Sequence, residues 1–168
     1  MAVFIQPDLI DRHYNVTLFK GYVFLLREKF GPEESKSFFI KTGIPEEYFE
    51  NQTNYVSEKW ADIFLTQLRS HPNFHNDDLD RAAELSISQE AMGYLQITVA
   101  KYLPTSSFMR LTIEFAKKVN KVDFYKINST TNNSFELEFT SRRNTPNFDL
   151  IILGCNTILQ TVPTITGN

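Results

Sequence analysis

Apolar residues recur at steps of three and four positions through most of the first half of the chain, which is the spacing of a helix face. Phe19, Tyr22, Val23 and Leu26 form one such face, and Gly31 ends that helix. The same spacing and the same kind of boundary residue recur further along. The predicted helices cover residues 16–30, 32–43, 58–70, 82–85 and 88–103. The first half of the chain therefore predicts a helical lobe.

The helix over residues 58–70 has the clearest local signals. Ser57 stands directly before it and is a residue type that caps helix N-termini, and its spacing turns Trp60, Phe64 and Leu68 toward the core. Residues 71–80, HPNFHNDDLD, are the most polar stretch of the chain, and we expect an exposed connection there.

Another amphipathic helix is expected after Pro104, with basic residues in its last turn and an elbow at Asn120. Charged residues such as Arg110, Glu114 and Lys117 fall largely on the opposite side from its apolar residues. The expected apolar face consists of Phe108, Leu111, Thr112, Phe115 and Val119.

Beyond Asn120 the apolar spacing changes from the period of a helix to the period of a strand. β-favouring residues fill positions 122–127, and the polar run 129–134 supplies a turn. After that turn, apolar and polar residues alternate, which predicts an antiparallel hairpin with one buried face. Phe135, Leu137 and Phe139 are expected to face the core, and Glu136 and Glu138 the solvent.

The segment 148–159, FDLIILGCNTIL, is apolar around most of a helical circumference. A helix of this kind needs a second covering surface, for which we expect another copy of the chain or a downstream domain. A symmetric homodimer is the simplest closed arrangement, and Cys155 would then lie near the contact.

Together these elements predict the α+β class: an N-terminal helical lobe followed by an antiparallel hairpin with packed helices. The length of 168 residues suits one domain, residues 1–168, with its own core. The final residues, VPTITGN, carry no terminating pattern. We therefore expect the domain to be the N-terminal part of a longer signalling protein.

Composition narrows the possible environment and partners. The chain has 15 Phe and 7 Tyr but one Trp, so aromatic side chains supply much of the expected core. Its net charge of −3 with no basic cluster argues against nucleic-acid binding. A single cysteine indicates a reducing compartment, and no apolar run suits a signal peptide or a membrane span. We expect a cytoplasmic domain.

Candidate catalytic chemistry is weak throughout the sequence. His71 and His75 are four apart, but Pro72 lies between them and no further ligand type completes a metal site. Cys155 has no histidine nearby in sequence and lies in an apolar segment. Glycine-rich phosphate loops are missing, and the acidic residues at helix starts are interpreted as solvated partners of helix dipoles, namely Glu33, Glu34, Glu46 and Glu47. We expect neither a metal site nor an enzyme.

The order of elements carries a family resemblance. The opening KGYVFLLREKFGPEESKSFFIKTGIPEEYF, and FELEFTSRR leading into FDLIILGCNTILQTVP, resemble the haem-nitric-oxide-binding and vinyl-4-reductase superfamily of ligand-sensing domains over residues 16–165. A second likeness is to relatives at the N-termini of bacterial histidine kinases and cyclases, through Asn120-Lys121-Val122 and the tail from Cys155 to Gly167. The resemblance implies a ligand-binding input domain.

Haem itself is not expected, because two of the family's haem contacts are altered. The family's Tyr-x-Ser-x-Arg motif falls on Phe139, Ser141 and Arg143, so the tyrosine hydroxyl is lost. The family's iron ligand is a histidine on the helix before the hairpin, and residues 108–122 contain none. The resemblance still implies an apolar cavity between lobe and sheet, with these candidate ligand-binding residues: Tyr94, Phe108, Met109, Phe115, Phe124, Phe139, Ser141 and Arg143.

The sequence thus leads to a hypothesis of function: a non-enzymatic sensory or regulatory domain. It would bind a small apolar or flat ligand, or a partner, and relay binding to a kinase or cyclase output. Two alternatives stay open, a dimerisation module without a ligand and the ligand-binding half of an AraC-type transcription regulator.

Overall fold

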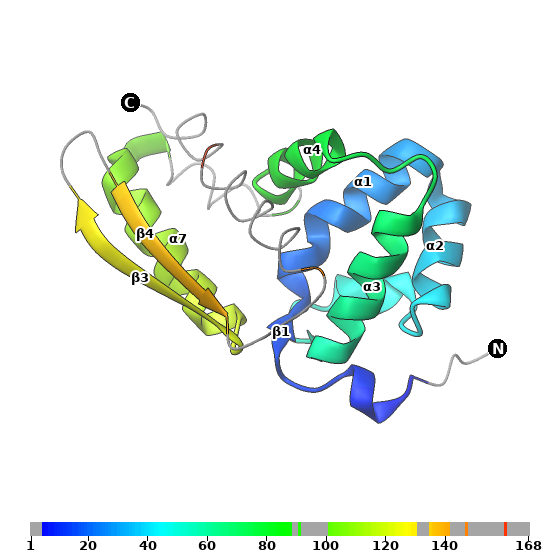
Figure 1. Cartoon of the computed structure of the whole chain (residues 1–168). Helices are drawn as coiled ribbons and strands as arrows, with labels where there is room; N and C mark the ends of the chain where they lie inside the picture. Colours follow the sequence, from blue (N-terminus) through cyan, green and yellow to red (C-terminus); the bar gives the residue numbers. More distant parts are fainter. Residues whose placement is uncertain are drawn as a thin grey trace.

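The fold belongs to the α+β class expected from the sequence, in a computed structural model that describes residues 5–88, 91, 101–130, 135–141, 147 and 160 (Figure 1). Helices α1 to α4 group together in a helical lobe, residues 5–88. Helix α7 and the strands β3 and β4 form a second group, the α7–hairpin unit, residues 101–130 and 135–141. Most of the predicted helix 88–103 falls outside the described residues. The whole of the predicted helix 148–159, with Cys155, also falls outside them.

The described elements follow one another in a simple order. The helical lobe contains η1 Pro7–Leu9, β1 Tyr14–Asn15, η2 Val16–Phe19, α1 Lys20–Phe30, α2 Pro32–Lys41, η3 Glu46–Glu50, β2 Tyr55–Val56, α3 Glu58–Ser70 and α4 Asp77–Ser86. The α7–hairpin unit contains α7 Thr105–Val119, β3 Asp123–Thr130 and β4 Phe135–Ser141. No helix in these described stretches has the length and apolarity to span a bilayer.

Helix boundaries in the lobe are set by local chemistry, as predicted. Gly31 ends α1 with φ at 84°, a backbone conformation that glycine adopts without steric cost, and Pro32 opens α2 directly afterwards. The Ser57 side chain accepts a hydrogen bond from the Trp60 amide at 3.1 Å and so caps α3. The predicted cap and glycine stop are therefore confirmed.

The core of the lobe is a cluster of aromatic rings around Trp60. The Trp60 ring stacks on Phe64 with centroids 5.0 Å apart and meets Phe19 edge-on at 4.9 Å. Its indole nitrogen, which would otherwise lack a partner in this interior, donates to Thr42 Oγ1 at 3.1 Å. Trp60, Phe64 and Phe39 are all 0% exposed. Aromatic residues thus supply the centre of the core, as the composition indicated.

Helices α1 and α4 pack at close range through a glycine. A methyl carbon placed at Gly21 would lie 2.0 Å from Ser86 Oγ and 2.1 Å from the Ala82 carbonyl oxygen. The second of these atoms is backbone and cannot move aside easily. Gly21 is therefore required for this helix pair to approach.

Two features of the lobe differ from the sequence prediction. The expected exposed connection over residues 71–80 is wrong in its second part, because α4 already begins at Asp77 and its Leu79 is 1% exposed. Asp78 stabilises this earlier start by accepting a hydrogen bond from the His75 amide at 2.7 Å. The small sheet of β1 and β2 was not predicted, because two residues per strand show no alternation.

The hairpin pairs in the predicted antiparallel sense. Tyr125 lies opposite Phe139 and Ile127 opposite Leu137, with an irregularity at Asn128. Leu137 and Phe139 are half-buried, whereas Glu136, Glu138 and Thr140 are exposed. The alternation is confirmed, although the apolar side of β4 is covered only in part.

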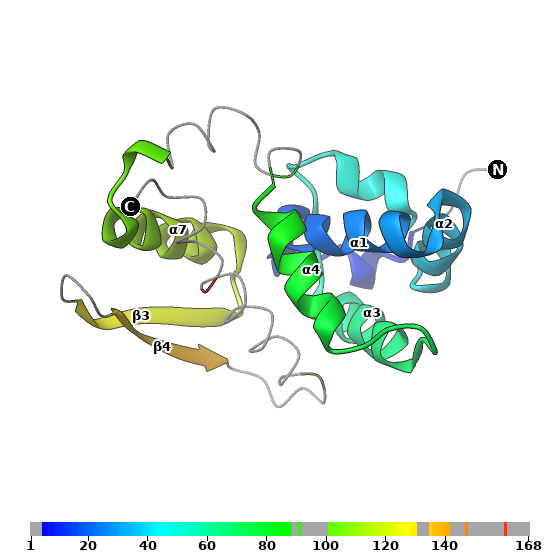
Figure 2. The same ribbon diagram turned by 90° about the horizontal axis from the view of Figure 1, so that it is seen from above.

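Helix α7 lies along one side of the hairpin (Figure 2), but its covered face is rotated from the predicted one. Phe108, Ile113 and Val119 are buried, whereas Leu111 is 56% and Phe115 is 55% exposed. Leu111 and Phe115 lie at one margin of the apolar arc, and Ile113 lies at the other. The prediction that Leu111 and Phe115 share the buried face is therefore wrong.

The two groups of elements meet at the end of α7. Asn120 forms an antiparallel bridge with Tyr14, and the Lys121 amide donates to the His13 carbonyl at 2.8 Å. Val122 is 6% exposed and joins the core of the lobe. Asn147, beyond the hairpin, also contacts the lobe, since its side-chain nitrogen donates to Thr66 Oγ1 of α3 at 2.9 Å.

Candidate functional site

A shallow cleft lies between α1 and η3, with a cavity volume of about 220 Å³. The α1 positions that line it are spaced by three and four residues, so they share one helix face. The η3 positions likewise lie on one side of that short helix. The cleft is lined by Lys20, Val23, Phe24, Arg27, Glu46, Phe49 and Glu50.

The floor of the cleft contains a buried carboxylate, Glu46, which is 2% exposed. One of its oxygens accepts from Arg27 Nε at 2.6 Å and lies 2.5 Å from Arg27 Nη2, and the other accepts from the Ser35 hydroxyl. We call these three residues the Glu46 clasp. It ties α1, α2 and η3 together, because each residue comes from a different element.

The interpretation of Glu46 as a solvated helix-start residue is therefore wrong, whereas Glu33, Glu34 and Glu47 are exposed as expected. Glu46 is drawn inward because nearby residues on both sides of it in the chain are core residues. Ile44 is 0% and Phe49 is 2% exposed. A carboxylate between such neighbours needs charged and hydrogen-bonding partners, which Arg27 and Ser35 provide.

The short helix η3 is held in place from its other side. The Tyr48 hydroxyl donates to the Tyr55 carbonyl of β2 at 2.9 Å, and the Asn54 side chain donates to the Tyr48 carbonyl at 2.8 Å. Burial raises the pKa of the Tyr48 phenol, so the hydroxyl keeps its proton through neutral pH. The η3 wall of the cleft is thus fixed to the sheet of β1 and β2.

The two cations of the cleft have different surroundings. Arg27 pairs with Glu46, and Glu50 Oε1 lies 3.9 Å from the Arg27 Nη2 atom. Lys20 is partly buried, and its ammonium has no ion pair or hydrogen bond to any residue that the structure describes. The two residues are seven positions apart on α1, or about 10 Å along the helix axis. The cleft therefore has one neutralised end and one cationic end.

The polar groups of the Glu46 clasp are occupied by one another. Ser35 is 0% exposed and its hydroxyl donates to Glu46, so it is not accessible as a nucleophile. The Glu46 carboxylate is occupied on both oxygens. The accessible groups of the lining include the Lys20 side chain, the Phe24 ring and the carboxylate of Glu50, which is 70% exposed.

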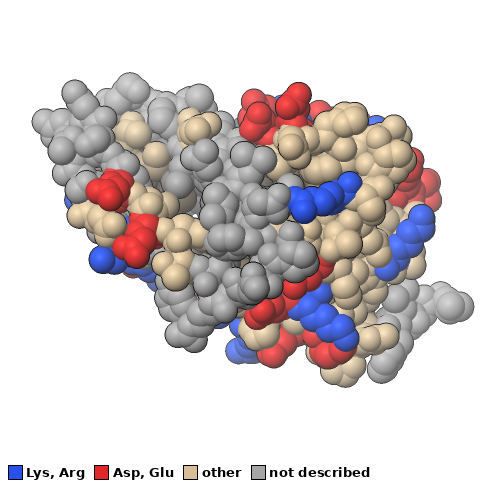
Figure 3. Space-filling view, viewed as in Figure 1, with Lys and Arg blue, Asp and Glu red and all other residues tan. Residues whose placement is uncertain are grey.

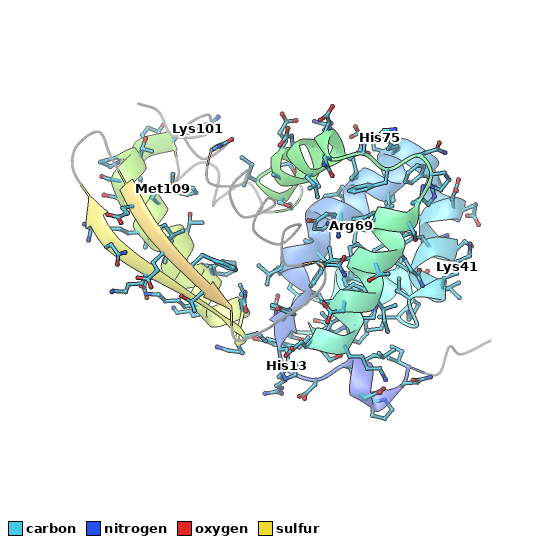
Figure 4. All side chains as sticks on the ribbon, viewed as in Figure 1. His13, Lys41, Arg69, His75, Lys101 and Met109 are labelled. Carbon is cyan, nitrogen blue, oxygen red and sulfur yellow. The ribbon has the colours of Figure 1, made fainter. Side chains whose placement is uncertain are left out.

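The described histidines are held in separate places. Within the described ranges, no three His, Cys, Asp or Glu side chains are grouped closely enough to hold a metal ion. The His71 ring lies 4.3 Å from the Phe30 ring, and its Nε2 is 3.5 Å from Glu34. His75 precedes α4, and His13 lies at the opposite end of the lobe (Figure 4).

Charges of both signs are interspersed over the helical lobe. Figure 3 shows lysine and arginine side chains next to aspartate and glutamate on the face in view. Ion pairs account for several of them, such as Arg81 with Glu28 at 2.8 Å and Lys29 with Asp78 at 2.5 Å. Hydrogen bonding to Arg81 lowers the pKa of Glu28, against a smaller desolvation effect.

None of the described candidate ligand residues predicted from the resemblance lines this cleft. Phe108 is buried on α7, Met109 is half-buried there, and Phe139 is half-buried on β4. Phe115 is exposed on α7. The backbones of Phe124 and Ser141 take part in the β3–β4 ladder. The side chains of these two residues, and the whole of Tyr94 and Arg143, fall outside what the structure describes.

Sequence reasoning missed the cleft because its charges look like ordinary surface positions. Lys20 and Arg27 flank an apolar helix face, where lysine and arginine commonly lie. Glu46 follows a proline at a helix start, which is also a common surface pattern. The sequence does contain one usable signal: Glu46 lies between Ile44 and Phe49, two apolar residues that are both buried.

Comparison of the chain with protein-family models, with curated proteins and with solved structures finds no match.

Proposed function

We propose that this chain is a non-enzymatic sensory or regulatory domain that binds a small ligand in the cleft between α1 and η3. The observation that carries the proposal is the composition of that cleft. Its floor is a charge-satisfied clasp, its wall includes Phe24 and Phe49, and one lysine on its rim lacks a described partner. A cleft whose floor charges are already paired and whose wall is apolar favours reversible binding of a ligand.

The size of the cleft limits the ligand. Pockets for drug-sized molecules are commonly 300–1,000 Å³, and this cleft has about 220 Å³. A porphyrin or another large flat ring exceeds that space. The proposed ligand is therefore a small metabolite. In this proposal the chain shares a sensing role with the haem-nitric-oxide-binding superfamily but does not bind haem.

A route for relaying binding exists in the chain connectivity. Lys20 opens α1, directly after η2, and η2 continues from β1. Tyr14 of β1 bridges to Asn120 at the end of α7. A ligand that repositions the start of α1 would thus act on the contact between the helical lobe and the α7–hairpin unit. The proposal places the domain at the input of a cytoplasmic signalling protein.

The test is thermal unfolding against a panel of small metabolites, because a ligand that binds the folded state raises its melting temperature. We expect at least one class to stabilise the unmodified chain and to lose its effect in Phe24→Trp, which fills the cleft. Phe115→Trp, on an exposed position of α7, is the matched control. Stabilisation that survives Phe24→Trp, or none from any class, would contradict the proposal.

A self-association module is the second candidate, favoured by the exposed Leu111 and Phe115 on α7. The expected partner is a second copy of the chain. Light scattering over a concentration series separates the candidates: Phe115→Arg would lower the mass of a dimer, whereas it would leave a monomeric ligand sensor unchanged.

A further inference from the structure

The charges around the cleft indicate which ligand it suits, provided that the proposed binding function holds. Of its two carboxylates, Glu46 is fully engaged by Arg27 and Ser35. Glu50 is 70% exposed and lies on the Arg27 side. Lys20 is therefore the cation of the cleft that has no described partner. An incoming anion would find a free ammonium there.

The surroundings of Lys20 make an anionic partner favourable. Lys20 is partly buried, so its side chain has less conformational freedom to lose when an anion binds its ammonium. Hydrogen bonds between an ammonium and a carboxylate or phosphate are shorter and stronger than neutral ones.

The rest of the cleft is apolar and short. Its apolar lining consists of Phe24, which is half-buried, and of Val23 and Phe49, which are 5% and 2% exposed. The Phe24 ring therefore offers apolar surface to a ligand body of a few carbon atoms. A second negative group at the far end would meet Glu50 and the buried Glu46, so a ligand with a single anionic group is preferred.

We infer that the cleft between α1 and η3 binds a small organic ligand with one anionic group, its carboxylate or phosphate at Lys20 Nζ and its apolar body along Phe24.

Isothermal titration of the full chain with four matched six-carbon probes tests this inference. Hexanoate and hexyl phosphate carry the anion, hexanol is neutral, and hexylamine is cationic. We expect the two anions to bind more tightly than hexanol and hexylamine, and their affinities to weaken as salt rises. The relative affinity of hexanoate and hexyl phosphate separates a carboxylate ligand from a phosphate ligand.

Lys20→Met is the decisive variant, since it keeps most of the apolar stem and removes the charge. We expect it to weaken hexanoate binding by at least about tenfold while leaving hexanol binding unchanged. Lys41→Met, at the exposed end of α2, is the matched control and should bind like the unmodified chain. Lys20→Gln repeats the test if Lys20→Met does not give a folded circular dichroism spectrum.

The outcomes separate the inference from the proposed function. Hexanol binding as tightly as hexanoate, with both lost in Phe24→Trp, overturns the anion inference and leaves the binding function standing. Equal loss of affinity in Lys20→Met and Lys41→Met also overturns it. Failure of every probe, together with no stabilisation by any metabolite class, overturns both.

Discussion

The helical lobe and the α7–hairpin unit use the same kind of amphipathic spacing and reach different degrees of burial. In the lobe, Trp60, Phe64 and Leu68 recur on α3 and are all 0% exposed. On α7, Leu111 and Phe115 recur at a helical step and are 56% and 55% exposed. The lobe has helices on several sides of its core, whereas α7 has the hairpin along one side. Spacing therefore predicts that a helix forms, and the neighbouring elements decide which part of its apolar arc is covered and how far.

The largest expected contrast is between one buried and one exposed aromatic residue. Trp60→Ala should lower the free energy of unfolding by about 3–5 kcal/mol, because it empties the centre of the ring cluster. Phe115→Ala should change it by less than about 1 kcal/mol, because over half of that side chain already meets solvent. Denaturant unfolding measures both, and similar losses would contradict the difference between the two regions.

The Glu46 clasp should respond unequally to removal of its two charges. Arg27→Met should cost about 3 kcal/mol, because it leaves a buried carboxylate with one remaining partner. Glu46→Gln should cost about 1–2 kcal/mol, since the amide still accepts hydrogen bonds and the Arg27 side chain, 38% exposed, reaches water. Equal costs by urea unfolding would mean that Glu46 is solvated in solution.

On β4 the expected effects are smaller and test the strand alternation. Phe139→Ala should cost about 1–2 kcal/mol, in proportion to its half-buried surface. Glu138→Ala should fall within about 0.5 kcal/mol, because its contact with Lys126, at 3.6 Å, is an exposed ion pair. Thermal unfolding of the two variants is the measurement, and a larger loss at Glu138 would contradict the observed register.

The smallest expected effect is a pH dependence at the start of α4. Burial raises the pKa of Asp78, but hydrogen bonds from Lys29 and the His75 amide together outweigh it, so the pKa lies below its ordinary value. The ionised form is thus favoured on folding, and its stabilisation is present above the ordinary carboxylate range and lost as pH falls below about 4. Asp78→Asn should reduce the decrease in the free energy of unfolding that occurs as the pH falls below about 4. Asp80→Asn, exposed on the same helix, is the control, and an equal flattening there would contradict the assignment to Asp78.

Local signals explain which parts of this structure could be predicted. The Ser57 cap, the Gly31 stop and the β4 alternation depend on residues within a few positions of one another, so the sequence displays them directly. The Glu46 clasp combines side chains from three elements, and none of its members is unusual in its own segment. The same reason hid the cleft, because Lys20 becomes distinctive only when η3 is placed beside α1.

The bridge between Tyr14 and Asn120 has a consequence for the order of folding. Contacts inside the helical lobe join residues up to about position 88, whereas this bridge joins positions more than a hundred residues apart in the chain. During synthesis, the lobe can collapse on its aromatic cluster before Asn120 leaves the ribosome. The α7–hairpin unit would then dock on a surface that is already formed, so the slow long-range closure comes last.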